Sequence, residues 1–271
     1  GHNTAGNAMR EFLEDQGIAC EMKDALSFAS EQVSRVVSNS YINIATKAPR
    51  FFQFLYWAGS GISSSKVKSV VYLANKQYAA SLGAYINENE FDVVLLPHLF
   101  PAEAITSLRR KHAIHARCYG IATDYTCSPF WEETELDGYF IPHQDLKEEF
   151  VERGIPEEKL IATGIPVSKR FTRVVDRETL REKFSVPENG KMLVIMSGSM
   201  GFGAVEALAQ QLCDQTTPLD RIFVMGGTNE SLKASLRKTF AQESRVKILD
   251  FTREVDEYMA ACDVLFTKPG G

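Results

Sequence analysis

The stretch Met192-Leu-Val-Ile-Met-Ser-Gly-Ser-Met-Gly-Phe-Gly203 indicates the fold class of this protein. It opens on a continuous apolar run, which is typical of a strand buried on both faces of a parallel sheet. A glycine-bearing loop follows, and residues 204–213 then have the spacing of an amphipathic helix. A strand, a loop and a helix in this order predict one unit of an α/β domain.

The same order of elements recurs along the rest of the sequence. Short apolar runs alternate with helical patterns, so we expect parallel sheets that are covered by helices on both faces. The other predicted strands are residues 92–96, 118–122, 138–141, 160–163, 221–225, 246–249 and 264–267, and the predicted helices include residues 5–15, 102–111, 145–153 and 177–184.

The chain of 271 residues is long for one domain of average size, and two domains are the better expectation. Residues 167–173 have no clear period and predict a linker. We therefore expect two Rossmann-like, doubly wound α/β domains, residues 1–168 and 169–271. The chain opens at Gly1-His2 and closes at Pro269-Gly-Gly271, inside glycine motifs, and we interpret it as truncated at both ends.

The composition argues against several classes of protein. Lys and Arg number 30 against 35 Asp and Glu, for a net charge of −5, whereas a protein that binds nucleic acid in bulk is usually basic. No apolar run reaches the roughly 18 residues that predict a membrane-spanning helix. The five cysteines are scattered and form no Cys-x-x-Cys pair, which indicates reduced cytosolic thiols rather than disulfides or a zinc site.

Residues 32–87 contain no Asp or Glu, although the protein as a whole is acidic. The aromatic run Phe51-Phe-Gln-Phe-Leu-Tyr-Trp57 lies in the middle of this segment. Basic side chains bind anionic headgroups and aromatic rings favour the bilayer interface, so the combination predicts a membrane contact. A helix that packs into the core is the alternative. The residues expected at the membrane or the acceptor are Arg50, Phe51, Phe52, Phe54, Tyr56 and Trp57.

Three glycine-bearing loops follow predicted strands of the second domain. Parallel sheets bind ligands at the carboxyl ends of their strands, and helix N-termini present free N–H groups to phosphate, so these loops predict a nucleotide site. Neither Gly-x-Gly-x-x-Gly nor a Walker lysine is present, and each loop alone also fits a tight turn. Asn229 equally fits a helix N-cap. The candidate residues are Ser197, Gly198, Ser199, Met200, Gly201, Gly203, Gly226, Asn229, Lys268, Gly270 and Gly271.

Polar side chains also follow predicted strands of the first domain. His98 and Asp124 come just after two of these strands, and His2 precedes the predicted helix 5–15. Groups that converge from separate strand ends predict an acid–base site, although His2 alone also fits a cap or a solvated side chain. His143 fits a helix cap, and we expect the basic stretch 109–112 to be solvated. The acidic run Glu132, Glu133, Glu135 and Asp137 predicts a solvated loop.

Two common chemistries lack their signatures. The sequence has no Asp-x-Asp and no cluster of His and Cys at metal-binding spacing, which disfavours a sugar transferase that depends on a divalent metal. It has no Gly-x-Ser-x-Gly, which disfavours an α/β-hydrolase.

Several stretches resemble, in order and spacing, the motifs of one family. Gly1-His-Asn-Thr-Ala5 resembles the end of its Gly-Gly-Gly-His loop, and Thr123-Asp-Tyr125 resembles its Thr-Asp-Phe block. Thr163-Gly-Ile-Pro-Val167 matches its Gly-Ile-Pro signature, and residues 197–203 and 259–271 match its last two motifs. The chain thus resembles GT-B glycosyltransferases of the monogalactosyldiacylglycerol synthase and processive diacylglycerol glucosyltransferase family, which is related to the lipid II-forming N-acetylglucosaminyltransferase.

The resemblance implies a GT-B fold, in which two Rossmann-like domains face a cleft. It implies an inverting, metal-independent transfer of glucose or galactose from a UDP-sugar to the hydroxyl of 1,2-diacylglycerol, with no cofactor besides that co-substrate. His2 would be the base, and Asp124 and His98 would orient it or contact substrate. Such an enzyme would lie in the cytoplasm, bound peripherally to an anionic membrane surface, and would have no nucleic-acid partner.

Three alternatives stay open on the sequence. The same fold could transfer N-acetylglucosamine to a polyprenyl-linked peptidoglycan precursor. The chain could be a non-catalytic module that binds a UDP-sugar or a lipid. A UDP-sugar 2-epimerase has the same architecture but needs no membrane segment.

Overall fold

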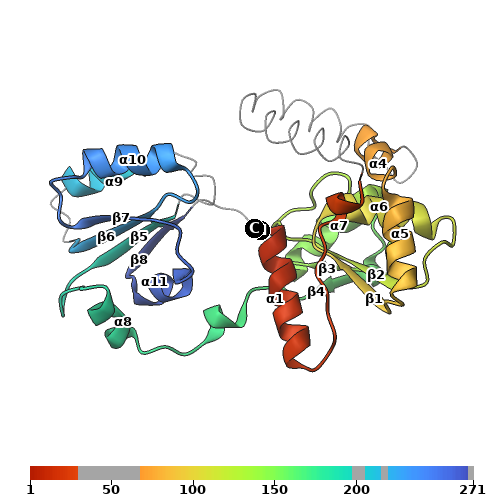
Figure 1. Cartoon of the computed structure of the whole chain (residues 1–271), viewed down its shortest axis with the longest axis horizontal. Coiled ribbons are helices and arrows are strands. Elements are labelled where there is room, and N and C mark those ends of the chain that lie inside the picture. The colour runs from red at the N-terminus through yellow and green to blue at the C-terminus, as the bar shows by residue number, and fades with distance from the viewer. Residues whose placement is uncertain (30–67, 197–204, 215–218, 268–271) are drawn as a thin grey trace. The chain divides into compact units, whose positions relative to one another are not determined.

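The computed structural model describes residues 1–29, 68–196, 205–214 and 219–267 (Figure 1). Contacts between residues divide the chain into two compact units, Gly1–Lys169 and Arg170–Gly270. Each unit contains a four-stranded, fully parallel sheet with helices packed on it. This confirms the predicted α/β class. In the described part of the chain, no helix has both the length and the apolar character needed to cross a bilayer.

The sheet of the first unit has the simple order β1-β2-β3-β4. Its strands are β1 (Val93–Leu96), β2 (Arg117–Ile121), β3 (Gly138–Ile141) and β4 (Leu160–Ala162). The α-helices of this unit are α1 (His2–Asp15), α4 (Val70–Asn75), α5 (Ala79–Glu88), α6 (Leu99–Arg109) and α7 (Lys147–Glu152), and its 3₁₀ helices are η1 (Ala25–Phe28), η2 (Trp131–Glu133), η3 (Gln144–Leu146) and η4 (Glu157–Lys159).

A tight core fixes the two strands that lead to the candidate site. Gly120, on β2, lies under Trp131 and Tyr139, whose rings meet edge to face at 6.0 Å. A Cβ atom at Gly120 would lie only 2.8 Å from the Trp131 ring, so no other residue fits without a shift. Because Leu96 pairs with Gly120, the carboxyl ends of β1 and β2 lie at the same edge of the sheet.

Of the acidic run 132–137, only Glu135 is exposed as predicted; for Glu132, Glu133 and Asp137 the prediction of a solvated loop was wrong. Glu133 is fully buried, and its carboxylate accepts hydrogen bonds from the Ser69 backbone N–H at 3.0 Å and from Ser69 Oγ at 3.1 Å. Glu132 is also buried. Asp137 accepts from both Arg109 Nη atoms, at 2.6 and 2.7 Å, and from the Cys118 N–H at 2.7 Å. These carboxylates satisfy donors that are distant in sequence, which a local pattern does not reveal.

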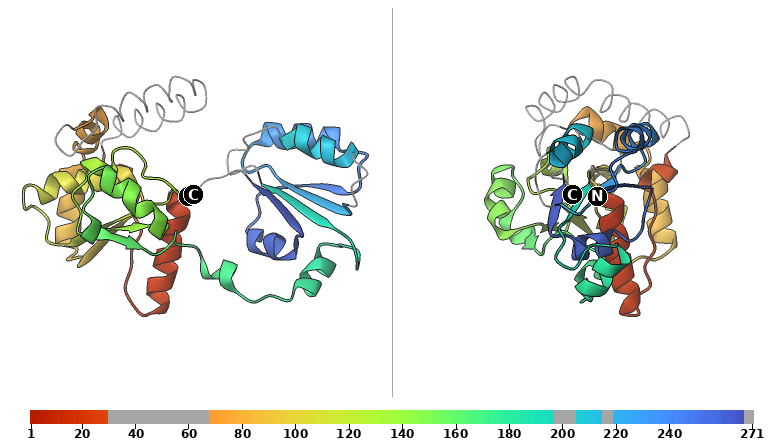
Figure 2. Two further views of the ribbon diagram at one scale, coloured as in Figure 1. Left: turned by 180° about the vertical axis from the view of Figure 1, so that it is seen from behind. Right: turned by 90° about the vertical axis from the view of Figure 1, so that its left-hand side faces the viewer.

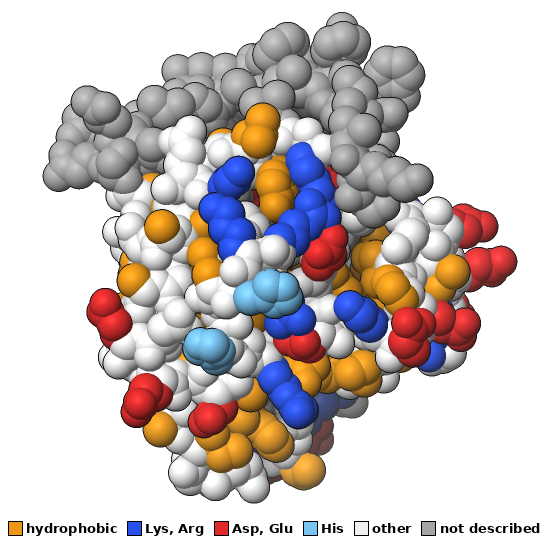
Figure 3. All heavy atoms as spheres, turned by 90° about the vertical axis from the view of Figure 1, so that its right-hand side faces the viewer, with side chains coloured by type: hydrophobic (Ala, Val, Ile, Leu, Met, Phe, Trp, Pro, Cys, Tyr) orange, Lys and Arg blue, Asp and Glu red, His pale blue; other side chains and the backbone are white. Residues whose placement is uncertain are grey.

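The basic stretch 109–112 is exposed at Arg110, Lys111 and His112, as predicted, and only Arg109 is half-buried. Arg109 pairs with Asp137 and Arg110 with Glu135. Figure 3 shows one face of the molecule on which Lys and Arg side chains lie close to carboxylates and to His side chains.

The second unit has the strand order β7-β6-β5-β8. Helices α9 and α10 cover one face of this sheet, and α8 and α11 cover the other (Figures 1 and 2). The strands are β5 (Met192–Met196), β6 (Arg221–Met225), β7 (Val246–Leu249) and β8 (Val264–Thr267), the helices are α8 (Arg177–Lys183), α9 (Val205–Asp214), α10 (Glu230–Thr239) and α11 (Val255–Ala261), and η5 (Lys169–Thr172) lies at the junction of the units.

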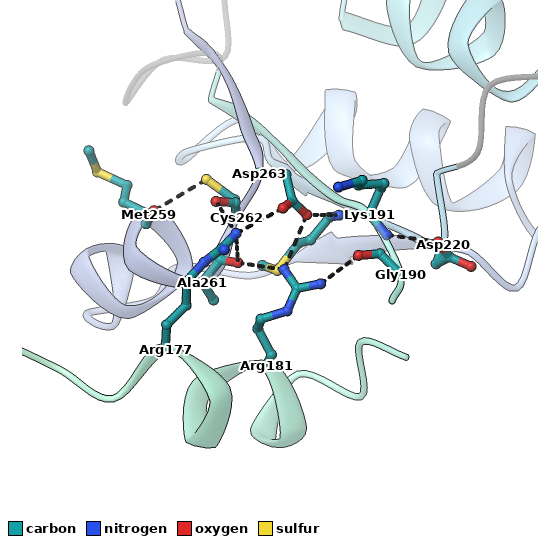
Figure 4. Close-up of polar contacts among 10 residues, drawn as sticks. Arg177, Arg181, Gly190, Lys191, Asp220, Met259, Ala261, Cys262 and Asp263 are labelled. Atoms are coloured by element: carbon teal, nitrogen blue, oxygen red, sulfur yellow. Dashed lines mark hydrogen bonds and ion pairs between the residues drawn. The ribbon is translucent and has the colours of Figure 1, made fainter. Parts of the chain in front are cut away.

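Asp263 ties three elements of the second unit together (Figure 4). It lies between α11 and β8, and its carboxylate accepts from Arg177 Nη2 at 2.9 Å, from Arg181 Nη1 at 3.1 Å and from the Met192 N–H at 2.8 Å. Desolvation opposes ionisation, but the bonds from Met192 and the two arginines prevail and lower the pKa of Asp263 to about 2. The carboxylate therefore joins α8 to β5 and β8.

We expect Asp263→Asn to destabilise the fold by about 2 kcal/mol at pH 7, because the charge-assisted bonds weaken and the buried Arg181 loses its counter-charge. The native carboxylate contributes stability above pH 4, which is lost as the pH falls from about 4 toward 2. The variant should lack this part of the acid dependence. Urea unfolding at pH 7 and at about pH 2, followed by circular dichroism, measures how much stability each protein loses in acid. The variant Glu182→Gln, at an exposed position, serves as control. Equal acid dependence in Asp263→Asn and the native chain would contradict this assignment.

Candidate active site

His2 lies where the first two strands of the sheet end. It is the first residue of α1, and its Nδ1 is 2.8 Å from the Pro97 carbonyl oxygen, just after β1, and 3.0 Å from Thr123 Oγ1, just after β2. The Thr123 side chain is buried. Three segments that are far apart in sequence thus meet at one imidazole nitrogen.

These contacts determine which nitrogen of His2 carries the proton when the ring is neutral. A backbone carbonyl can only accept a hydrogen bond, so Nδ1 carries the hydrogen and donates it to Pro97. Nε2 then has the free lone pair. His2 is therefore oriented by its Nδ1 and presents a proton-accepting atom, which is the arrangement a general base requires.

His98 is the N-cap of α6 and lies against His2. Its Nδ1 accepts a hydrogen bond from the Phe100 N–H at 3.0 Å, so a neutral His98 ring carries its hydrogen on Nε2. The two imidazole rings meet edge to face, with centroids 4.4 Å apart. Burial, with a smaller effect of His2, lowers the pKa of His98 to about 4. The site therefore places a neutral His98, with its hydrogen on Nε2, beside the His2 ring.

The orienting groups differ from those that the sequence indicated. The half-buried carboxylate of Asp124 accepts a hydrogen bond from Ser128 Oγ at 3.1 Å, and the side chain that contacts His2 is its neighbour Thr123. Thr123 belongs to the stretch Thr123-Asp-Tyr125, in which the sequence indicated a role only for Asp124. The Pro97 carbonyl gives no signal in a sequence, because every residue has one. A role of Asp124 in substrate contact stays a prediction.

The carboxyl edge of the second sheet has a reversal in strand order. From β5 the chain proceeds to β6 and β7 on one side and returns to β8 on the other, with Met196 paired to Thr267. Ligands of such sheets bind at this switch point. Several predicted residues follow β5 and β8 in the sequence and lie outside the described residues: Ser197, Gly198, Ser199, Met200, Gly201, Gly203, Lys268, Gly270 and Gly271. The predicted membrane residues Arg50, Phe51, Phe52, Phe54, Tyr56 and Trp57 also lie outside them.

Gly226 and Asn229 follow β6, and each has a structural role. Asn229 Oδ1 accepts from the Leu232 N–H at 3.0 Å and caps α10. A Cβ atom at Gly226 would lie 2.8 Å from Lys233 Cγ, so this glycine makes room for a buried lysine stem. Their contact with a nucleotide stays a prediction. In the described ranges, no three His, Cys, Asp or Glu side chains are placed to hold a metal ion together.

We expect the His98 ring to stay neutral, with its hydrogen on Nε2, until the pH falls to about 4, well below the ordinary value of 6.5. The unfolded chain binds this proton first, so the folded state loses stability as the pH falls from about 6.5 toward 4. Two-dimensional ¹H–¹⁵N spectra of the histidine rings would measure both the tautomer and the titration. A His98 ring that titrates near 6.5, or carries its hydrogen on Nδ1, would contradict the described geometry.

Comparison with known families assigns the chain to one of them. Residues 2–167 match the family described as monogalactosyldiacylglycerol (MGDG) synthase. The chain is 26% identical over 274 residues to a processive diacylglycerol β-glucosyltransferase of Bacillus cereus (strain B4264), and the alignment covers 100% of this chain and 69% of that relative. A protein of the same name from Bacillus cytotoxicus is 25% identical over the same coverage.

Solved structures agree with the fold. The chain superposes on UDP-GlcNAc 2-epimerase of Neisseria meningitidis, bound to UDP-GlcNAc, with a TM-score of 0.54 and 13% identity, covering 74% of this chain and 61% of that one. It superposes on S. aureus MnaA with UDP with a TM-score of 0.54 and 14% identity, covering 75% and 60%. The chain thus spans less than two thirds of these proteins. The likenesses concern the fold alone, and they fit the predicted GT-B class.

Proposed function

The chain belongs to the monogalactosyldiacylglycerol synthase family, and from this premise we propose that it transfers a hexose from UDP-glucose or UDP-galactose to the hydroxyl of 1,2-diacylglycerol. The observation that carries the proposal is the His2 imidazole, which is held at Nδ1 by Pro97 and Thr123 and keeps its Nε2 lone pair free. A transferase of this kind needs one positioned base for its acceptor hydroxyl, and the described geometry of His2 supports this role.

The proposed reaction is a single displacement. The acceptor hydroxyl oxygen attacks the anomeric carbon of the donor sugar while His2 Nε2 takes up its proton. The bond from that carbon to the UDP oxygen breaks, and UDP leaves with the electron pair. Attack from the face opposite to the leaving group inverts the anomeric centre. His98 stays neutral beside the base, so it adds no positive charge that would oppose proton uptake by His2.

The leaving UDP gains negative charge in this step, and the proposal assigns its stabilisation to the second unit. Backbone N–H groups in glycine-bearing loops and at helix N-termini suit this task without a metal or a further cofactor. The strand order supports the assignment, because β5 and β8 end side by side at the switch point of the sheet. The corresponding residues are Ser197 to Gly203 and Lys268 to Gly271.

We further propose that the protein works at the cytoplasmic surface of a membrane without spanning it. Diacylglycerol is a membrane lipid, so an enzyme that uses it must reach the bilayer surface. The segment from Arg50 to Trp57 combines a cation with five aromatic residues and is the candidate for this contact.

The decisive experiment offers three donors in parallel to the full-length protein. Vesicles that contain diacylglycerol are mixed with UDP-glucose, UDP-galactose or UDP-N-acetylglucosamine, and the lipids are separated for glycolipid product. Hexosyl-diacylglycerol from one of the first two donors would support the proposal and identify the sugar. Transfer of N-acetylglucosamine to a polyprenyl-linked acceptor, with none to diacylglycerol, would contradict it and favour the peptidoglycan-type alternative.

We expect His2→Ala to lower kcat by roughly 100-fold or more, which is the usual contribution of a general base. Thr123→Val keeps the base but removes one group that orients it, so the loss should be roughly three- to tenfold. The exposed His115→Ala serves as the matched histidine control. Steady-state rates with the preferred donor measure all three. A His2→Ala protein with unchanged kcat would rule out His2 as the base.

A further inference from the structure

Glu103 is a fully buried carboxyl that the proposed reaction does not use. It lies on α6, and its Oε2 accepts a hydrogen bond from Asn75 Nδ2 at 2.6 Å. No described residue forms a hydrogen bond with its Oε1. An ionised carboxylate can accept roughly four hydrogen bonds, and this one receives a single bond from a neutral amide. The surroundings of Glu103 therefore suit the neutral form of the carboxyl.

The short helix α4 packs on α6 and is held at each end by a buried carboxyl group (Figure 1). At its first turn, Ser69 caps the helix by accepting from the Tyr72 N–H at 3.1 Å, and Glu133 in turn holds Ser69. At its last residue, Asn75 donates to Glu103. A helix of six residues is not stable by itself. The position of α4 therefore depends on these two attachments and on the packing of Tyr72.

The two carboxyl groups differ in the donors that they receive. Glu133 accepts from both the N–H and the hydroxyl of Ser69, which supports a charge. Glu103 faces only the Asn75 amide. That amide is itself oriented by the buried Tyr78, whose hydroxyl donates to Asn75 Oδ1 at 3.1 Å and leaves the NH₂ group for Glu103. The attachment at Glu103 is thus the one that ionisation would disturb.

The charges around Glu103 also favour its neutral form. Glu132 and Glu133, both buried, come from η2, and Lys68 precedes α4 and donates to the Glu133 backbone oxygen at 2.7 Å. Burial raises the pKa of Glu103 to about 8, with Glu133 and Glu132 adding to the rise and the Asn75 bond and Lys68 opposing it. The remaining charged groups at this interface form pairs: Arg153 with Glu132, and Arg110 with Glu135.

We propose that the Glu103 carboxyl is a proton-controlled latch, whose neutral form holds α4 on α6 and whose ionisation releases α4. In the neutral form the hydrogen is on Oε1, because Oε2 accepts from Asn75. Loss of this proton leaves a charge in the core with one neutral donor, and release of α4 lets water reach it. Helix α6 itself stays in place, because its residues 102–106 are buried in the core. The inference does not depend on the proposed transferase function.

The latch makes the docking of α4 depend on pH. The pKa of Glu103 is about 8 when α4 is docked and returns to its ordinary value of 4.5 when release exposes the carboxyl. Between these values the docked state binds one more proton than the released state. Docking therefore weakens as the pH rises from 4.5 and stays constant above about 8. Across this range the ratio of released to docked α4 should rise about tenfold per pH unit.

Hydrogen exchange in the full-length protein measures this ratio, once the intrinsic exchange rate at each pH is divided out. The reporters are the N–H groups of Leu73 and Lys76, which bond to the carbonyls of Ser69 and Tyr72. In the native chain we expect a tenfold rise per pH unit between about pH 6 and 7.5, and a plateau above about 8. Glu103→Gln keeps the shape of the neutral carboxyl and should remove the rise.

The matched control is Glu135→Gln, which removes an exposed carboxylate beside the same interface and should keep the native slope. A native ratio that does not change with pH, or an equal slope in Glu103→Gln, would overturn the latch. The same slope at the N–H groups of Leu82 and Ile86 on α5 would also overturn it, because the unit would then open as a whole.

A second measurement follows the native carboxyl directly. In ¹³C spectra of the protein labelled at its glutamate side chains, one carboxyl carbon should titrate near pH 8, and Glu103→Gln should remove that signal. A native spectrum in which every glutamate titrates near or below 4.5 would overturn the proposal, whether or not the variant folds.

Discussion

The parallel pairing of β1 with β2 is the constraint on which the candidate site depends. Leu96 lies opposite Gly120, so the residues that follow both strands emerge at one edge of the sheet. Pro97 and Thr123 reach the same nitrogen of His2 only because of this register. A shift of one residue along either strand would turn the pleat and separate the two groups. Gly120 protects the register, because a side chain there would collide with Trp131.

The strands were predictable because a buried parallel strand is a continuous apolar run. Residues 138–141, 192–196, 221–225, 246–249 and 264–267 were predicted with the bounds that the structure has. Helix ends were less predictable, since they depend on caps. The helix expected at residues 102–111 is α6, Leu99–Arg109, and it begins earlier because His98 caps it. An imidazole is an uncommon N-cap, so the local pattern did not indicate it.

Contacts between distant residues set the limit of what the sequence could show. The run from Glu132 to Asp137 has the composition of a solvated loop, yet Glu133 lies in the interior because Ser69, far away in sequence, supplies its donors. Thr123 illustrates the same point at the site. Its neighbour Asp124 is the more reactive residue type, but the position after β2, rather than the type of residue, decides which side chain faces His2.

His98 joins the stability of the fold to the chemistry of the site. Its Nδ1 accepts from the Phe100 N–H in the first turn of α6, so the ring cannot rotate without leaving that N–H unpaired. That same bond places the hydrogen on Nε2 and fixes the ring against His2. Burial keeps the ring neutral, because its pKa lies near 4. A charged partner in this position would repel the imidazolium that forms when His2 takes up a proton, and a capped, neutral imidazole avoids that cost while it holds the base in place.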